Sequence, residues 1–220
     1  MENISIIDFY KDIFDLKGFP MDFLIDSKGN TELGHFNVFD TAKFYFSGTK
    51  KSAMTYNRRL YYKISLIKGK NLVEYADKTV LIEQQGILFA TPKIPYRYTP
   101  QNKKQSGFFC VFTKEFMSKS KTGFHIDELP IFKPNSDFVY QLNNKQFLEL
   151  ESIFKKMDAE ISSDYTFKYD LLRNYVLELI HLGQKLEPIK STETATNAAS
   201  RISSLFIELL ERQFQIENNA

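Results

Sequence analysis

The hydrophobic pattern of this chain changes once, near Asn143, and that change constrains the fold more than any other feature. Before it, short apolar runs alternate with Gly, Pro and Asn turns, a spacing typical of an all-β barrel or sandwich. After it, apolar residues recur at alternating steps of three and four, which is the period of an amphipathic helix. The sequence therefore predicts an α+β protein with a β-rich N-terminal part followed by helices.

Seven segments before Asn143 have the residue content of strands. They are residues 34–40, 60–67, 72–76, 79–83, 87–90, 96–98 and 107–113. Asp77 and Lys78 separate two of these segments, and a connection of two residues predicts a tight hairpin. An amphipathic turn at residues 6–14 is expected to pack on the outside of the β-rich part.

The first helix after the change carries its apolar residues on one face, and Asn143 or Asn144 is placed to cap it. This stripe consists of Phe147, Leu150, Phe154, Met157 and Ile161. A second helix is expected to run to about Lys185, because Gly183 and Pro188 mark its end. The two helices should form an antiparallel pair.

The second helix is apolar along two lines. One line contains Tyr165, Tyr169, Leu172, Val176 and Leu179, and the other contains Leu171, Tyr175, Leu182 and Leu186. A helix with two apolar faces needs two partners. One partner is the β-rich part or the first helix, and the other is predicted to be a second subunit, with Tyr169, Leu172, Val176 and Leu179 at the dimer interface. The alternative is a helix buried inside one compact domain.

A polar linker at residues 190–196 leads to a third helix with apolar positions Ala198, Ile202, Leu205, Phe206, Leu209 and Leu210. The expected organisation is therefore a β-barrel at 1–142, a pair of helices at 143–188 that includes the predicted dimer contact, and a linker with one further helix at 189–220.

Charge and cysteine content limit the classes of function. The chain has 29 basic and 27 acidic residues, a net charge of +2, whereas a domain that grips a nucleic-acid backbone usually shows a clustered basic excess. Its single cysteine, Cys110, allows no intrachain disulfide. The N-terminus lacks the pattern of a signal peptide, and no apolar run approaches the ~18 residues of a membrane span. The sequence predicts a cytoplasmic protein with no membrane contact that does not bind DNA by itself.

Residues 58–113 carry an ordered set of motifs. A Tyr62-Lys63-Ile64-Ser65-Leu66-Ile67 strand runs into a turn at Gly69, a Pro92-Lys93-Ile94-Pro95-Tyr96 turn follows, and the stretch ends in Gly107-Phe108-Phe109-Cys110-Val111-Phe112. This order resembles the N-terminal cupin-like, double-stranded β-barrel of AraC/XylS-type bacterial transcription regulators, in a Bacteroidetes-like subgroup.

The resemblance covers nearly the whole chain. Residues 168–175 look like the dimerising helix of such regulators, residues 197–202 like their interdomain segment, and residues 205–214 like the first helix of their DNA-binding domain. In the family, two helix-turn-helix units follow, each of which places a helix in the major groove. The resemblance implies an effector-sensing and dimerising region whose DNA-binding domain is truncated, so that DNA contact comes only through the missing part.

Cupin enzymes hold a metal through two motifs of histidine and glutamate ligands. Aligning the end of the first motif on Gly69 places Tyr62 at the glutamate, and places Thr55 and Asn57, or Tyr56 and Arg58, at the histidines. Aligning the second motif on Gly86 places Arg97 at its histidine. All ligand positions are lost, the three histidines of the chain lie far apart, and no nucleophile elbow or phosphate-binding loop is present. No enzyme activity, metal or cofactor is predicted.

A small barrel can still hold a small molecule among its inward-facing residues. On the 60–67 strand, Lys63 shares one face with Tyr61 and Ser65, and the apolar set of Tyr62, Ile64 and Leu66 is the safer choice for the core. An inward Lys63 would select an anionic effector such as a sugar acid or another carboxylate, whereas the alternative places it on the solvated face. Tyr62, Phe89, Tyr96 and Tyr98 either stack on a sugar or fill the barrel, and His35 opens an early strand. The candidate ligand-binding residues are His35, Tyr62, Lys63, Phe89 and Tyr96.

Three functions compete at this point. The first is the sensing region of a regulator, which predicts a homodimer broken by Leu172→Asp or Val176→Asp. The second is a stand-alone cupin, and the third is an interaction module whose barrel is filled and takes no ligand.

Overall fold

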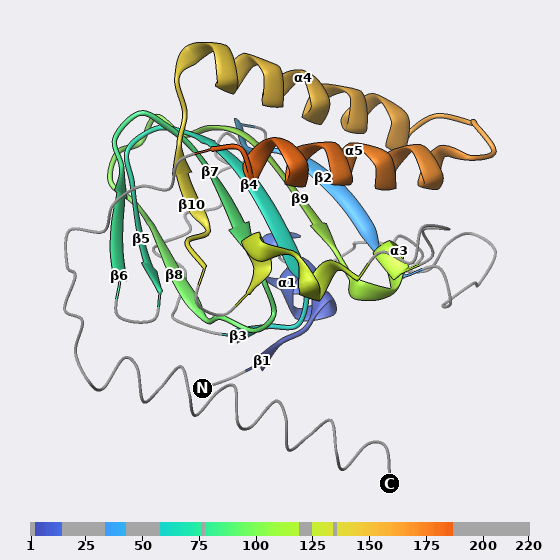
Figure 1. The fold of residues 1–220 in the computed structure, drawn as a ribbon, viewed down its shortest axis with the longest axis horizontal. Coiled ribbons are helices and arrows are strands. Elements are labelled where there is room, and N and C mark those ends of the chain that lie inside the picture. The colour runs from blue at the N-terminus through green and yellow to red at the C-terminus, as the bar shows by residue number, and fades with distance from the viewer. Residues whose placement is uncertain are drawn as a thin grey trace, which may run out of the picture.

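The computed structural model describes residues 3–14, 34–42, 58–75, 78–118, 125–133 and 136–186. Over these residues the protein combines antiparallel sheets with helices (Figure 1). The helices are α1 (Ile6–Phe14), α3 (Lys114–Ser118), α4 (Asn144–Ile161) and α5 (Lys168–Gly183), and two 3-10 turns are η3 (Ile126–Glu128) and η4 (Pro130–Phe132). The predicted α+β class is therefore confirmed.

The larger sheet has five antiparallel strands in the order β10-β7-β4-β9-β2. Their bounds are β2 (Phe36–Asp40), β4 (Tyr62–Lys68), β7 (Gln85–Ala90), β9 (Ser106–Phe112) and β10 (Val139–Gln141). A second antiparallel sheet has the order β6-β5-β8, with β5 (Asn71–Tyr75), β6 (Lys78–Ile82) and β8 (Tyr96–Pro100). The seven predicted strands are all present.

Three short strands were not predicted, because two or three residues carry too little alternation to be recognised. They are β10 and the parallel pair formed by β1 (Asn3–Ile4) and β3 (Arg58–Arg59). The β5–β6 hairpin is confirmed, but Lys78 belongs to β6, where it pairs with Tyr75, and not to the turn. Residues 76–77 lie outside the described residues.

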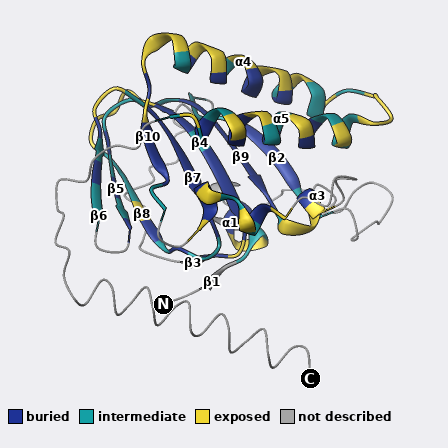
Figure 2. Cartoon of the chain, in the orientation of Figure 1, coloured by how far each residue is buried: buried dark blue, intermediate teal, exposed yellow. Residues whose placement is uncertain are grey.

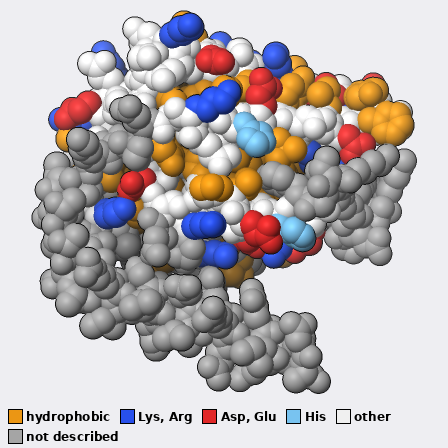
Figure 3. Space-filling model, viewed as in Figure 1, with side chains coloured by type: hydrophobic (Ala, Val, Ile, Leu, Met, Phe, Trp, Pro, Cys, Tyr) orange, Lys and Arg blue, Asp and Glu red, His pale blue; other side chains and the backbone are white. Residues whose placement is uncertain are grey.

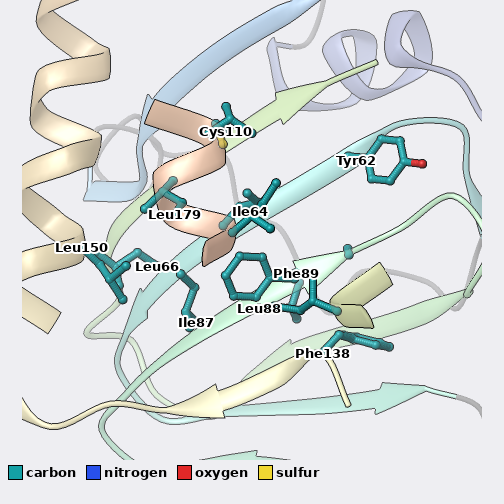
Figure 4. Close-up of a cluster of buried hydrophobic side chains, with 14 of the residues drawn as sticks. Tyr62, Ile64, Leu66, Ile87, Leu88, Phe89, Cys110, Phe138, Leu150 and Leu179 are labelled. Carbon is teal, nitrogen blue, oxygen red and sulfur yellow. The ribbon is translucent and has the colours of Figure 1, made fainter. Parts of the chain in front are cut away.

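One face of the larger sheet packs against α4 and α5. Ile64 lies directly opposite Phe89 and Cys110 on the neighbouring strands, so these side chains share this face. A Cβ atom on Gly183 of α5 would overlap the ring of Phe89, which shows how closely helix and sheet approach. Figure 4 shows Leu150 of α4 and Leu179 of α5 over Ile64, Leu66 and Phe89. This face and the helix pair form the main hydrophobic core.

The opposite face of the larger sheet is covered by other elements. A Cβ atom on Gly86 would lie 3.0 Å from the Ile82 side chain of β6, so the second sheet covers this face near β7. Nearer β9 and β2, the same face packs against α1, which Figure 1 shows on the side of the sheet away from α4 and α5. Both faces of the larger sheet are therefore buried.

The expected closed barrel is not found. Among the described strands, the register pairs each sheet only within itself, so the two sheets face each other without a hydrogen-bonded closure. All described strands lie before residue 142 and α4 and α5 follow it, but α1 and α3 also precede it, and strands and helices contribute to one core, so the predicted domain division stays a prediction. Residues 189–220, with the predicted third helix, lie outside the described residues. No helix among the described residues is long and apolar enough to cross a membrane.

Helix α4 follows its prediction closely. The Asn143 side chain accepts a hydrogen bond from the Gln146 backbone, and the Gln146 side chain accepts one from the Asn143 backbone, which completes a capping box. The predicted stripe faces the sheet, with Phe147, Leu150, Phe154 and Met157 buried and Ile161 half-buried. Figure 2 shows the buried side of α4 turned toward the sheet and its exposed side turned away.

Helix α5 buries one of its two apolar lines within a single chain. Leu172, Val176 and Leu179 are each 0% exposed, and Tyr169 is half-buried. These side chains therefore serve the core of the protomer. The second line is half-buried and consists of Leu171, Tyr175, Leu182 and Leu186. Tyr175, Leu182 and Leu186 also pack against the main core with part of their surface, so each of the four side chains is only partly exposed.

Candidate functional site

Two of the predicted ligand-binding residues, Tyr62 and Phe89, lie on the sheet face that packs against helices and 3-10 turns. The Tyr62 ring stacks on Phe112, with ring centroids 5.4 Å apart, and its hydroxyl donates a hydrogen bond to Asp127. The Phe89 ring packs edge-on against Phe132 and lies under Gly183. Both side chains fill the core, as the alternative in the sequence analysis allowed.

Asp127, which accepts the Tyr62 hydroxyl, also accepts a hydrogen bond from Lys114 over 2.6 Å. Burial opposes the carboxylate charge, but the hydrogen bonds from Lys114 and Tyr62 outweigh burial and lower the pKa of Asp127. This group ties η3 to β4 and to α3.

Tyr96 begins β8 in the smaller sheet and is 2% exposed. The guanidinium of Arg59 lies 3.9 Å from the centre of the Tyr96 ring and donates a hydrogen bond to the Tyr96 carbonyl oxygen over 3.1 Å. Burial raises the pKa of the Tyr96 hydroxyl, and the charge of Arg59 acts in the opposite direction. Tyr96 is therefore packed between a cation and the ring of Phe138.

Lys63 lies on the other face of β4, beneath α1, and is 9% exposed. Its Nζ atom lies 4.2 Å from the ring centre of Phe109 and 5.8 Å from that of Phe9. An ammonium over aromatic faces gains a cation–π attraction that strengthens when water is excluded. The structure thus places Lys63 on the face that the larger sheet shares with α1 and the second sheet, and not on a solvated surface.

His35 lies at the same face, next to the first residue of β2. The Tyr10 hydroxyl lies 2.8 Å from His35 Nε2, and Asn37 donates its own hydrogen bond to the Tyr10 oxygen over 2.9 Å. The Tyr10 hydroxyl therefore joins the imidazole of His35 to the amide of Asn37. Burial lowers the pKa of His35 to about 4 and raises that of Tyr10, so both side chains are neutral near pH 7.

These side chains, with the aromatic residues around them, form a group that we name the Lys63 cluster. It draws on α1, β2, β4 and β9 and consists of Phe9, Tyr10, His35, Asn37, Phe39, Tyr61, Lys63, Phe109 and Val111. Its apolar members form a hydrophobic cluster separate from the main core. The cluster combines one cation, an imidazole, a phenol and an amide with several aromatic rings.

Two members of the Lys63 cluster, Lys63 and His35, are predicted from the sequence as ligand-binding residues, and the other members are not. Asn37 could have been found, because it is the polar residue inside the apolar run of β2 and shares a strand face with His35. Tyr10 carries no such signal, because its position depends on how α1 docks on the sheet.

Other chemistry finds little support in the part of the chain that the structure describes. No three residues among the described His, Cys, Asp and Glu side chains gather in a way that could hold a metal ion. Cys110 is fully buried, and burial raises the pKa of its thiol to about 12, which keeps it protonated and unreactive at pH 7.

No protein-family model and no curated protein sequence matches the chain. Several solved structures match the chain at low sequence identity. ToxT from Vibrio cholerae is 14% identical with a TM-score of 0.41, and the match covers 78% of this chain and 64% of ToxT. The AraC-like transcriptional activator CuxR is 10% identical with a TM-score of 0.38, and the match covers 79% of this chain and 56% of CuxR.

A further ToxT structure, with an unsaturated fatty acid bound, is 18% identical with a TM-score of 0.40, and the match covers 78% of this chain and 62% of ToxT. The chain thus spans less than two thirds of the length of each of these proteins. TM-scores at this level do not establish a common fold, so the family and function of the chain are argued below from its own residues.

Proposed function

We propose that this chain is the ligand-sensing and dimerising region of an AraC-type transcription regulator. The observation that carries the proposal is the buried Lys63 beneath α1, which lies over aromatic rings on the sheet face that also carries Asn37. The ordered motifs of residues 58–113 and the order of two antiparallel sheets followed by a helix pair support the same assignment.

The ligand is an anion, namely a carboxylate. A carboxylate next to Lys63 Nζ gains a charge-assisted hydrogen bond in surroundings of low dielectric constant, where such a bond is stronger than in water. Asn37 carries a second amide N–H beside the one that it donates to Tyr10, and the rings of Phe9 and Phe109 provide apolar contacts for a ring or an alkyl body. A sugar acid and an apolar carboxylate both meet these requirements.

Isothermal titration calorimetry separates these two ligand types. The full chain is titrated with galacturonate as the sugar acid and with 4-phenylbutyrate as the apolar carboxylate. In Lys63→Met, which keeps the aliphatic stem and removes the charge, the affinity for the bound anion is expected to fall about tenfold or more. Lys155→Met is the matched control, because Lys155 is exposed on α4 and should leave the affinity unchanged.

Equal affinity in Lys63→Met and the native chain would overturn the ligand site. If neither compound binds the native chain, the second candidate is favoured, an interaction module without a ligand. The packing of Tyr62, Phe89 and Tyr96 against neighbouring rings supports that candidate, because their side chains already fill the space around them.

The dimer is proposed to form through the second line of α5, since the first line is used inside the protomer. Apolar side chains gather among charged ones on the face that carries α4 and α5 (Figure 3), and Tyr165 and Phe167, between these helices, are 53% and 60% exposed. Leu171→Asp should lower the mass measured by light scattering from dimer to monomer without unfolding the chain. Asn174→Asp, at an exposed position of α5, is the control, and a dimer in both variants would contradict this interface.

DNA contact is proposed to require residues outside this region, as expected from the near balance of 29 basic and 27 acidic residues. An electrophoretic mobility assay with this chain alone should show no shift at about 150 mM salt, and a specific shift would contradict this part of the proposal.

A further inference from the structure

Arg173 is a buried cation on the core-facing side of α5, and it holds a neighbouring element by its backbone. Its side chain is 4% exposed, and its Nε donates a hydrogen bond to the Phe116 carbonyl oxygen of α3 over 2.6 Å. The guanidinium also lies 4.9 Å from the Phe116 ring centre and donates a second hydrogen bond to Asp170. Two of these contacts, both to Phe116, join α5 to α3, and the bond to Asp170, which lies one turn earlier on α5, holds the guanidinium in place.

Helix α3 is in turn packed directly on the segment that leads into β2. Gly34 has a φ of 71°, and a Cβ atom there would overlap the backbone nitrogen of Phe116. The next ring in this segment, Phe36, stacks on Phe116 with centroids 5.0 Å apart and planes inclined by 26°. The two segments are therefore in close contact through both backbone and rings.

The same segment contains His35 of the Lys63 cluster. The backbone nitrogen of His35 donates to the Thr113 hydroxyl over 3.0 Å, and the Thr113 nitrogen donates to the His35 carbonyl oxygen over 2.9 Å. Thr113 immediately precedes α3. A continuous series of contacts thus leads from Tyr10 and His35, through α3, to Arg173.

We propose that Arg173 is a positioning residue that couples the Lys63 cluster to helix α5. A rearrangement around His35 moves the segment at Gly34 and hence α3, and the hydrogen bond from Arg173 transmits that movement to α5. This inference rests on the proposed function, since the rearrangement would be caused by the ligand and α5 would carry the dimer contact. It adds to that function the route by which the two sites influence each other.

Arginine suits this role for a physical reason. Its planar guanidinium donates from Nε to the carbonyl oxygen of Phe116 and from a terminal nitrogen to Asp170 at the same time, in a fixed geometry. Burial lowers the pKa of Arg173, and the charge of Asp170 opposes this effect, so the charge is retained inside the protein. A lysine would keep the charge but not the two directed bonds.

Hydrogen exchange measured by mass spectrometry tests the coupling in the full chain. Tyr10→Phe perturbs the cluster by removing the hydroxyl that joins His35 and Asn37, and the readout is the exchange of residues 168–183. In the native background, Tyr10→Phe should raise this exchange about twofold or more, the size expected of residues that interact through a shared network. In the Arg173→Met background, the same substitution should raise it by clearly less.

Two further variants keep the test decisive. Arg173→Lys serves if Arg173→Met fails to fold, and it should also reduce the response of α5. Lys155→Met, on the exposed face of the helix pair, should leave the response as large as in the native chain. An equal response of α5 with and without Arg173, or no response in the native chain, would overturn the inference.

Titration with 4-phenylbutyrate and galacturonate separates this inference from the proposed function. If one of them binds and changes the exchange of α5 only when Arg173 is present, both proposals hold. If neither binds but Tyr10→Phe still acts through Arg173, the ligand proposal fails and the coupling stands. If a carboxylate binds through Lys63 and α5 responds equally in Arg173→Met, the ligand proposal stands and the coupling fails.

Discussion

At the scale of single residues, His35 makes the stability of the protein depend on pH. Its pKa in the folded chain is about 4, below the ordinary histidine value of 6.5, because burial disfavours the charged ring. The unfolded chain therefore binds the proton more readily between these values. The stabilisation is complete above about pH 6.5 and is lost as the pH falls toward 4.

We expect the free energy of unfolding to fall by about 2–3 kcal/mol between pH 6.5 and pH 4 through His35 alone, since one pKa unit corresponds to about 1.4 kcal/mol. Urea denaturation of the native chain and of His35→Gln at both pH values measures this contribution as the difference between the two slopes. Parallel pH dependence in the two proteins would show that His35 is not the titrating group.

Lys63 shows what alternation in a single strand leaves undecided. The pattern of residues 60–67 separates the side chains into two faces correctly, with Tyr62, Ile64 and Leu66 on one and Lys63 on the other. It does not reveal that the second face is covered as well, because the covering helix α1 is far from β4 in sequence. From the sequence, a lysine on a strand is therefore predicted to lie on a solvent-exposed face, unless it is known which elements cover that face.

At the scale of elements, the capping box of α4 gives a direct test of local structure. Asn143→Ala removes the acceptor for the Gln146 backbone and should lower the free energy of unfolding by about 1 kcal/mol. Thermal denaturation followed by circular dichroism measures the loss. Asn143→Asp, which keeps an acceptor at the cap, should remain close to the native value, and equal losses in both variants would argue against the cap.

The contact between α5 and β7 depends on the absence of a side chain at Gly183. Gly183→Ala would place a methyl group against the Phe89 ring in a packed core, and we expect a loss of about 1–3 kcal/mol although alanine favours the helix. Asn174→Ala, exposed on the same helix, should change stability by less than about 0.5 kcal/mol. Chemical denaturation of both variants checks this, and a stabilised Gly183→Ala would show that the helix shifts to make room.

Strands and helices with long periodic patterns were predictable, and the short elements were not. Seven strands, α1, α4 and α5 all carry enough residues for their period to be read. The dimer-facing line of α5 was assigned to Tyr169, Leu172, Val176 and Leu179, whereas three of these four side chains are fully buried in the protomer. Periodicity reports that a line is apolar, but not which partner covers it.

At the scale of the whole molecule, this burial changes the expected effect of Leu172→Asp. The substitution places a carboxylate where the side chain is 0% exposed, so it should unfold the chain rather than separate two folded subunits. The expected loss is about 4 kcal/mol or more. Far-UV circular dichroism with light scattering distinguishes the outcomes, since a folded monomer would support a dimer interface at Leu172, and an unfolded chain would show that Leu172 belongs to the core of the protomer.

The candidate site was only partly predictable at this scale, because the Lys63 cluster is assembled from four elements. His35 and Lys63 are 28 residues apart in the sequence, and Tyr10 precedes both. Their meeting depends on the antiparallel register of β2, β9 and β4, which places Asn37 opposite Val111 and Val111 opposite Lys63. Such a register is fixed by packing on both faces, and no local motif encodes it.

The strand order also has a consequence for the way the chain acquires its structure. β5 pairs with β6, which follows it directly in the sequence. β2 pairs with β9, and its Phe36 lies opposite Phe112, which is much later in the sequence. Closing so long a loop is entropically unfavourable until other contacts exist, so β2 should gain protected amides later than β5 and β6 in pulse-labelled refolding. Simultaneous protection would contradict this order. Before β2 pairs with β9 during refolding, β9 is an unpaired apolar edge strand. Refolding at high protein concentration should therefore favour aggregation through this edge.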